Sequence, residues 1–304
     1  ASIQAAVDAA FAAGGGRVVT SELEHNAVCR ALAATAEIEH RSVAAWSPDG
    51  EETAESFRRA IRPDTRLVVC THASNVFGVT FPLRRLAALA HESGALFCVD
   101  AAQTAGVLPI DMERDGIDYL CVAAHKGLYA PMGVGLLLCR ERNGILPLIR
   151  GGTGSHSLSE EQPWDLPDRL ESGTLNLPGI VGLTAGIRFV REHGREAICR
   201  HEIGLLQRLY DGLAELPAVH LYTPRPVYGE TAPVLSVNID GVPSEEVAAA
   251  LDRRGIAVRA GLHCAPSAHR RFGTLPDGTV RFAPSVFNTE REVGEIYRFF
   301  RTFR

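Results

Sequence analysis

An aspartate and a lysine each follow a short apolar run near the middle of the chain. Leu96–Val99 ends at Asp100. Tyr119–Ala124 ends at His125 and Lys126. Compact apolar runs without polar alternation are typical of strands that are buried on both faces of a parallel sheet. Ligands of such sheets bind outside the carboxyl ends of the strands, so we expect the acid and the lysine to project into one crevice.

This pair suits chemistry on carbonyl compounds. Desolvation favours the neutral form of a lysine, and a neutral amine forms Schiff bases. Pyridoxal phosphate uses such a lysine, and an acidic partner keeps its ring nitrogen protonated, which makes the ring an electron sink. Lys126 and Asp100 fit these two roles. A capping aspartate and a surface lysine would give the same pair, so the pair alone leaves both interpretations open.

The residues around the pair favour the cofactor interpretation. VDAAQTAG and AAHKGLYAPMGVG resemble the cofactor signature of class V aminotransferases, which are fold-type I pyridoxal-phosphate enzymes. Asp100, Gln103, His125 and Lys126 match it in order and spacing. The resemblance implies that Gln103 hydrogen-bonds the ring oxygen of the cofactor and that His125 helps to hold its phosphate. The chain departs from the pattern at Ala123, where the family usually has a serine or threonine that donates to the phosphate.

The same resemblance gives roles to four residues that would otherwise be read as caps and turns. His25 follows a glutamate, as in the family, where the imidazole lies over the pyridine ring; it is also suited to proton transfer. Asn75, in the sequence HASNVFG, is implied to contact the substrate carboxylate. Thr153 and Ser155, in a GGTGS run, are implied to reach the cofactor phosphate of a partner subunit, so we expect a homodimer.

A second group of polar residues lies near the carboxyl terminus. VRAGLHCAPSAH places Arg259, His263 and Cys264 together, and GTVRFAP places Arg281 on the next expected strand. Two neighbouring arginines suit a bidentate grip on a carboxylate. Cys264 is in a polar loop beside basic residues, and we expect a reactive thiol there.

The stretch RAGLHCA resembles the RxGHHCA signature of group II cysteine desulfurases, the branch that includes selenocysteine lyases. Leu262 stands where that signature has its first histidine. The resemblance implies that L-cysteine is converted to L-alanine and that Cys264 takes the sulfur as a persulfide, for transfer to an acceptor protein or thiol. Lys126 and His25 would then serve catalysis, and Arg281, Arg259 and Asn75 would bind the substrate. A selenocysteine lyase, another C–S lyase and a cofactor-free scaffold protein remain alternatives.

Composition excludes several other classes of protein. The 304 residues carry a net charge of −5 without a basic run, which argues against a nucleic-acid partner. No apolar stretch approaches the length of a membrane span. The seven cysteines show no metal-binding spacing, and an odd number of mostly apolar-flanked thiols suits a reducing cytoplasm.

Helical and strand patterns alternate along the chain, which predicts an α/β fold. The resemblance implies a fold-type I transferase with a mainly parallel sheet in a large domain over residues 1–193 and a smaller α+β domain over residues 194–304. In the family a phosphate-binding segment precedes the first helix, so we expect the N-terminal part of the large domain to be missing. The strands expected in the two domains are Arg17–Thr20, Ser42–Trp46, Arg66–Ala73, Leu96–Val99, Tyr119–Ala124 and Val134–Cys139, then His220–Tyr222, Val234–Ile239, Ile256–Arg259 and Thr279–Phe282.

Overall fold

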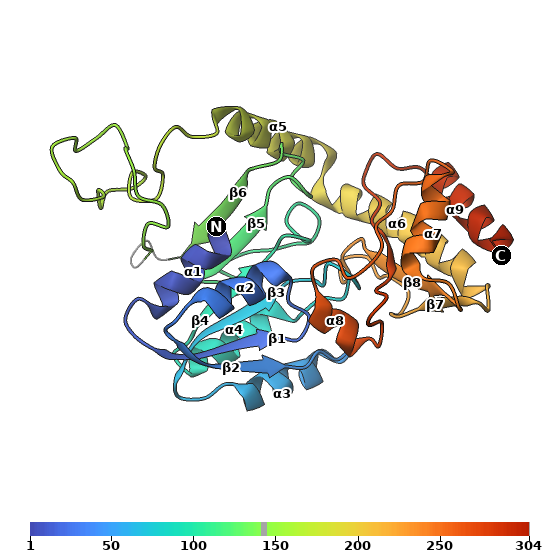
Figure 1. Ribbon diagram of the computed structural model, residues 1–304, viewed down its shortest axis with the longest axis horizontal. Helices are drawn as coiled ribbons and strands as arrows, with labels where there is room; N and C mark the ends of the chain where they lie inside the picture. The colour runs from blue at the N-terminus through green and yellow to red at the C-terminus, as the bar shows by residue number, and fades with distance from the viewer. Residues whose placement is uncertain (141–144, 304) are drawn as a thin grey trace.

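A six-stranded sheet forms the centre of the computed structural model, which describes residues 1–140 and 145–303 (Figure 1). The strand order is β2-β1-β3-β4-β5-β6. Five strands are parallel, and β6 pairs antiparallel with β5. The predicted α/β class with a mainly parallel sheet is therefore confirmed. The strands are β1 (Gly16–Ser21), β2 (Ile38–Ala44), β3 (Thr65–Thr71), β4 (Leu96–Asp100), β5 (Tyr119–Ala123) and β6 (Gly135–Cys139).

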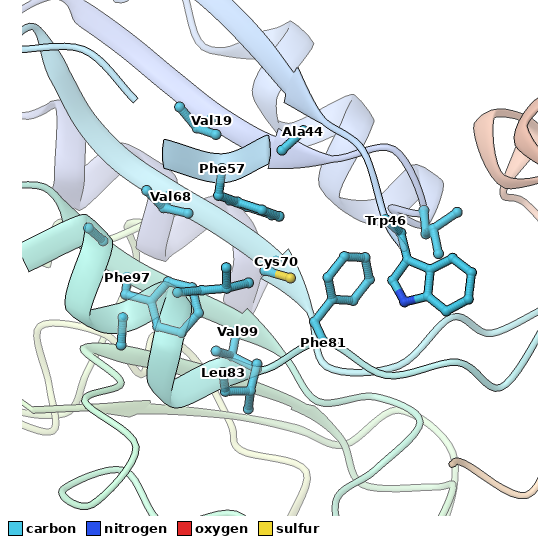
Figure 2. Packing of buried hydrophobic residues seen from close by; sticks show 14 of the residues in the cluster. Val19, Ala44, Trp46, Phe57, Val68, Cys70, Phe81, Leu83, Phe97 and Val99 are labelled. Carbon is cyan, nitrogen blue, oxygen red and sulfur yellow. The ribbon is translucent and has the colours of Figure 1, made fainter. Parts of the chain in front are cut away.

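Helices cover both faces of this sheet. On one face α1 (Ser2–Phe11) and α2 (Asn26–Ala34) pack against alternate strand residues such as Leu67. On the other face α3 (Gly50–Ala60) and α4 (Leu83–Glu92) do the same, and Figure 2 shows Phe57 of α3 beside Val68 and Phe97. Burial on both faces explains why the central strands are continuous apolar runs.

A second sheet with its own helices follows in residues 194–304, which are called the C-terminal region below. The long helix α5 (Leu177–His193) leads into it, and α6 (Arg195–Ala214) is its first helix. Its antiparallel sheet has the order β7-β8-β9 and packs against α6, α7 and α9. A capping box of Thr289 and Glu292 starts the last helix. The remaining elements are β7 (Val219–Leu221), β8 (Leu235–Ile239), α7 (Ser244–Asp252), α8 (Pro266–Arg271), β9 (Val280–Phe282) and α9 (Glu290–Thr302).

The sequence analysis predicted one strand of this region wrongly and missed one helix. The stretch Ile256–Arg259 is not a strand, because only Arg259 pairs with the neighbouring strand, through an isolated bridge to Arg281. Residues 256–258 have no bridge partner in the described part of the chain, and the chain turns at Gly261, whose φ of 93° suits glycine. Helix α8 was not expected, and it packs Ala268 into the core of the large sheet. No helix in the described ranges is long and apolar enough to cross a membrane.

Candidate active site

A cleft of about 620 Å³ lies between the carboxyl ends of the large-sheet strands and the C-terminal region. The two polar groups that the sequence placed far apart both line it. These lining residues are His25, Asn75, Gln103, His125, Lys126, Arg259, His263, Cys264 and Arg281. The strand order explains why the residues after different strands lie together. Strands β3, β4 and β5 are adjacent and parallel, so the loops that follow them share one edge of the sheet.

Lys126 lines the cleft, whereas Asp100 is buried and is not among the lining residues, yet each charge affects the pKa of the other. Asp100 ends β4 and is 6% exposed, and its Oδ1 accepts a hydrogen bond of 2.9 Å from the Ala102 N–H. Burial raises the pKa of Asp100, while Ala102, Lys126 and His25 act in the opposite direction. Lys126 is open to the cleft, yet desolvation by the cleft walls lowers its pKa. A buried carboxylate beside an amine of lowered pKa suits the pairing expected for a cationic ring and its lysine.

Lys126 is the only lysine in the sequence, although lysine and arginine together number 31. Its loop is closed by a 2.9 Å hydrogen bond from the Tyr129 N–H to the Lys126 carbonyl. On one side the backbone of this loop packs directly against the backbone at Gly106, because a Cβ at Gly106 would overlap the Gly127 carbonyl oxygen. An arginine could supply positive charge anywhere on the surface, so a single lysine held in a fitted loop at the cleft indicates a need for a titratable amine.

His25 is fixed by the helix that it precedes. It is the N-cap of α2, and its Nδ1 accepts a 3.0 Å hydrogen bond from the Ala27 N–H. The neutral ring therefore carries its proton on Nε2, the nitrogen left for the cleft. Desolvation lowers the pKa of His25, and the nearby Asp100 carboxylate partly opposes that shift.

A buried acid next to His25 was not predicted. Glu24 is completely buried, and its Oε1 accepts hydrogen bonds from the Ser21 hydroxyl and from the Thr71 N–H, the latter at 2.9 Å. Its Oε2 has no partner among the described residues. Burial raises the pKa of Glu24 to about 8, and the charge of Asp100 acts in the same direction. Glu24 is therefore mainly neutral at pH 7.

The two arginines form a cationic wall opposite the lysine. Arg259 and Arg281 are bridged by a 2.8 Å bond from the Arg281 N–H to the Arg259 carbonyl. Arg281 Nη1 also donates to the Asn75 carbonyl at 2.9 Å. Neither arginine forms a salt bridge with a residue in the described ranges. Burial lowers the pKa of Arg281, and so does the Arg259 charge. This wall is suited to bind an anion.

Cys264 is exposed in the cleft on a backbone of unusual shape. Its φ is 58° and that of His263 is 47°, and both values are uncommon for residues with a side chain. Three hydrogen bonds hold this turn. The His263 carbonyl accepts from Asn75 Nδ2 at 2.8 Å, the Cys264 carbonyl accepts from the Asn26 N–H at 2.7 Å, and His263 Nε2 donates to the Thr279 carbonyl at 3.0 Å. These hydrogen bonds fix the backbone that carries the thiol.

The sequence model for the family described as aminotransferase class-V matches residues 2–296. A protein of Klebsiella pneumoniae named cysteine desulfurase is 35% identical over 290 residues, which are 93% of this chain and 70% of that protein. The chain belongs to the class V aminotransferase family. A probable cysteine desulfurase of Synechocystis is 32% identical over 79% of the chain. The chain spans 57% of that relative's length and 59% of a Methanothermobacter thermautotrophicus relative's length.

Solved structures agree with this membership. The apo structure of a cysteine desulfurase from Thermococcus onnurineus has a TM-score of 0.83 and 30% identity, and the match covers 98% of this chain and 76% of that one. The Escherichia coli cysteine desulfurase CsdA has a TM-score of 0.87 at 24% identity, covering 99% and 76% of the two chains, and this likeness shows the fold. The fold-type I architecture expected for a class V chain is thereby confirmed.

Thr153 and Ser155 are two predicted site residues of this class V chain that lie away from the cleft. They are in the segment of residues 145–176, which extends away from the C-terminal region (Figure 1). Their hydroxyls are 3.0 Å apart, and the Ser155 hydroxyl also donates to Asp168. A role toward the cleft of the same chain is therefore not supported, whereas a role toward a partner subunit stays a prediction.

Tyr129 and Glu202 line the cleft but were missed by the sequence analysis. The Tyr129 hydroxyl donates to Glu202 Oε1 at 3.3 Å. Glu202 lies on the buried face of α6, among residues such as Ile198 and Ile203. An acid on the apolar face of an amphipathic helix is a visible signal, because such a side chain is rarely buried without a partner.

Proposed function

We propose that this class V chain is the body of a pyridoxal-phosphate-dependent cysteine desulfurase, which removes sulfur from L-cysteine to give L-alanine. The observation that carries the proposal is the position of Lys126, Arg281 and Cys264 around one cleft. An amine, an anion site and an exposed thiol are the three groups that such a reaction needs. Relatives named cysteine desulfurase, at 34 to 35% identity over 93% of the chain, support the same assignment.

The residues of the cleft fit the cofactor. Lys126 would hold it covalently, Asp100 would pair with the ring nitrogen, and Gln103, His125 and His25 would contact the ring oxygen, the phosphate and the ring face. The buried Asp100 carboxylate supports this fit, because its Oδ1 has only a neutral N–H donor and Lys126 is nearby. When bound, pyridoxal phosphate supplies an electron sink for the negative charge that develops on the substrate α-carbon. Ala123 offers no hydroxyl to the phosphate, so His125 is the contact proposed there.

The protein groups divide the work of the reaction. Arg281, with Arg259 and Asn75, holds the substrate carboxylate and so orients the α-carbon. Lys126 Nζ, whose pKa is lowered by desolvation, accepts the α-proton. Asp100 remains ionised to stabilise positive charge on its partner, and the Nε2–H of His25 is a further donor at the cleft.

Cys264 completes the reaction. Its thiolate attacks the sulfur of the substrate, so that a sulfur–sulfur bond forms while the bond between that sulfur and the β-carbon breaks. The electron pair of the broken bond stays on carbon, which takes a proton, and alanine leaves. Cys264 retains the sulfur as a persulfide, and a thiol of an acceptor protein or small molecule then removes it. The exposed position of Cys264 supports this last transfer.

We also propose that the chain acts as a homodimer. Large apolar side chains are exposed along residues 145–187, including Ile149, Leu158, Trp164, Leu177 and Val181. An exposed apolar surface of this extent is typical of a protein interface. Thr153 and Ser155 lie in the same stretch, so dimerisation would bring them toward the cleft of the partner subunit.

Product analysis tests the proposed function. The complete protein is loaded with pyridoxal phosphate and incubated separately with cysteine, selenocysteine and cystathionine, and the products are identified. We expect alanine from cysteine and a mass increase of one sulfur on the Cys264 peptide. Alanine from selenocysteine alone would favour a selenocysteine lyase, and pyruvate with ammonia would favour another C–S lyase. A protein that stays colourless with added cofactor and yields no product would favour the scaffold alternative.

A further inference from the structure

The loop that carries Lys126 is packed against other segments of the chain on two opposite sides. Helix α5 approaches its backbone without intervening side chains, because a Cβ at Gly186 would overlap the Leu128 carbonyl oxygen and one at Gly182 would overlap the ring of Pro131. Gly106 makes a similar approach from the opposite side. The loop is therefore held between two surfaces of backbone, and small displacements of either one would reach Lys126.

Tyr129 is the large side chain that leaves this loop toward the C-terminal region. Its φ is 53°, an uncommon value for an aromatic residue that must be held by its surroundings. Phe189 of α5 meets its ring edge to face with 5.0 Å between centroids, and Phe287 does so at 5.7 Å. The hydroxyl then donates to Glu202 Oε1 at 3.3 Å.

Glu202 is a buried acid for which the proposed reaction has no use. It is 3% exposed on α6 and lines the cleft. The backbone of Val286, five residues after Arg281, lowers the pKa of both Glu202 and Tyr129, which places it beside the pair. Burial raises the pKa of Glu202 to about 7 and that of Tyr129 to about 12, so the tyrosine remains the donor at neutral pH. A buried carboxyl is costly, so a specific contact must offset its desolvation.

We propose that Tyr129 and Glu202 are a positioning pair, which ties the Lys126 loop to α6 and to the segment that follows Arg281. The pair thereby fixes the lysine relative to the arginine that holds the substrate. This inference rests on the proposed function only in assigning Lys126 and Arg281 to one substrate. The contacts that fix the loop exist whatever that substrate is.

The test compares this pair with a second Tyr–Glu pair of the same chain. Tyr297 donates to Glu215 at 3.2 Å outside the cleft, where the contact is exposed, so Tyr297→Phe and Glu215→Ala are matched controls. The variants under test are Tyr129→Phe, Glu202→Ala and Glu202→Gln, and Gln keeps an oxygen that can accept from the tyrosine. The first readout is the rate at which acetic anhydride modifies Lys126 in the complete protein after dialysis against hydroxylamine. Peptide mass identifies the site, because the peptide that contains Lys126 can hold no second lysine from these 304 residues.

We expect Tyr129→Phe and Glu202→Ala to change the modification rate of Lys126 by at least about threefold, the effect of losing one hydrogen bond that holds the loop. In the loaded enzyme kcat should fall by about tenfold with KM within about twofold, because the pair acts on the lysine and not on substrate binding. Glu202→Gln should recover most of both values, and the two controls should match the parent.

Two outcomes would overturn the inference. The first is a Lys126 modification rate and kcat in Tyr129→Phe equal to those of Tyr297→Phe. The second is a loss that Glu202→Gln fails to recover while the thermal midpoint of that variant equals that of the parent. Should the parent release no alanine from cysteine, the proposed function fails, yet the modification rates of Lys126 still decide whether the pair positions the loop.

Discussion

The two sides of the cleft are built in different ways. The lysine side stands at the ends of buried parallel strands, where Asp100 and Glu24 are almost fully enclosed and burial shifts their pKa values. The cysteine side stands on a turn with two uncommon backbone conformations, and Cys264 is exposed. A carboxylate that must pair with a cationic ring benefits from a rigid site that excludes water, because the two charges attract each other more strongly there. A nucleophile that must receive sulfur and then release it needs access to solvent and to a second protein.

The two sides are joined by hydrogen bonds that cross the cleft. Asn75 follows β3, and its side chain donates to the His263 carbonyl. Asn26 begins α2, and its backbone N–H donates to the Cys264 carbonyl. Because the Asn75 side chain already has this partner, its predicted role toward the substrate rests on its remaining N–H. Its Oδ1 is buried and has no partner among the described residues. The strained turn is therefore maintained by the rigid side of the molecule.

The largest effect should come from the lysine side. Lys126→Ala removes both the amine that would hold the cofactor and the base that accepts the α-proton, so turnover should fall by about 10⁴-fold or more. Alanine release from cysteine measures this, and borohydride reduction with labelled cofactor should place no label on the variant. A variant that releases alanine at the parent rate would show that the assignment of Lys126 is wrong.

A change on the cysteine side should separate the two halves of the reaction. Cys264→Ser is nearly isosteric, but a hydroxyl cannot accept sulfur, so alanine formation should fall by about 10³-fold or more while cofactor binding is kept. Intact mass after a pulse of cysteine should show one added sulfur on the parent and none on the variant. Cys29→Ser is the control, since Cys29 lies on α2 and is only partly buried. Sulfur on another cysteine would contradict the proposed role.

The cationic wall between the two sides should affect binding more than chemistry. Arg281→Ala leaves the substrate carboxylate without its partner, which should weaken binding by about 2–5 kcal/mol and raise KM accordingly. Arg259→Ala should have a smaller effect, because Arg259 is more exposed and holds no backbone group of the other side with its side chain. Initial rates over a range of cysteine concentrations measure both. Unchanged KM values in both variants would place the carboxylate elsewhere.

Much of the lysine side could be predicted from the sequence. Short apolar runs predict the strands, and a parallel sheet brings the residues that follow them to one edge, so the sequence placed Asp100 at the end of β4 and Lys126 after β5. The family signature added Gln103 and His25. The cysteine turn was placed in the cleft, but its positive φ values and its hydrogen bonds to the other side depend on tertiary packing, which no local pattern carries.

The errors have the same origin. Ile256–Arg259 has the composition of a strand, but a strand needs a pairing partner from another segment, and only Arg259 has one among the described residues. Glu202 was missed, because its partner Tyr129 is 73 residues away. Thr153 and Ser155, by contrast, are no error of this kind, because their role toward a partner subunit was inferred by resemblance alone and stays a prediction. Contacts between distant segments thus mark the limit of the sequence analysis.

The pH dependence of the free energy of unfolding can test how completely water is excluded from Glu24 on the lysine side. The pKa of Glu24 is raised from 4.5 to about 8 in the folded protein, so between these values the folded state binds more protons than the unfolded state. Stability from this group is therefore complete below pH 4.5 and is lost as the pH rises toward about 8. Between pH 6 and 8.5 the parent should lose about 2–3 kcal/mol that Glu24→Gln does not lose.

Urea unfolding at the two pH values measures this difference. Glu113→Gln, a substitution of an exposed glutamate, is the matched control and should keep the pH dependence of the parent. If Glu24→Gln and the parent lose stability equally, Glu24 is ionised in the folded protein, and the lysine side is more hydrated than its burial indicates.

The smallest effect separates structure from chemistry at a single residue. His25 caps α2 through Nδ1 and presents Nε2 to the cleft, so its two nitrogens belong to different functions. Asparagine is a favourable N-cap and alanine is not, so His25→Ala should be less stable than His25→Asn by about 1 kcal/mol. Both variants lack the imidazole, and both should lose about 10²-fold in turnover if the ring contributes to proton transfer. Urea midpoints and alanine release measure the two effects separately. Full activity in His25→Asn would reduce His25 to a helix cap, and the chemistry of the lysine side would then depend on Lys126 and Asp100.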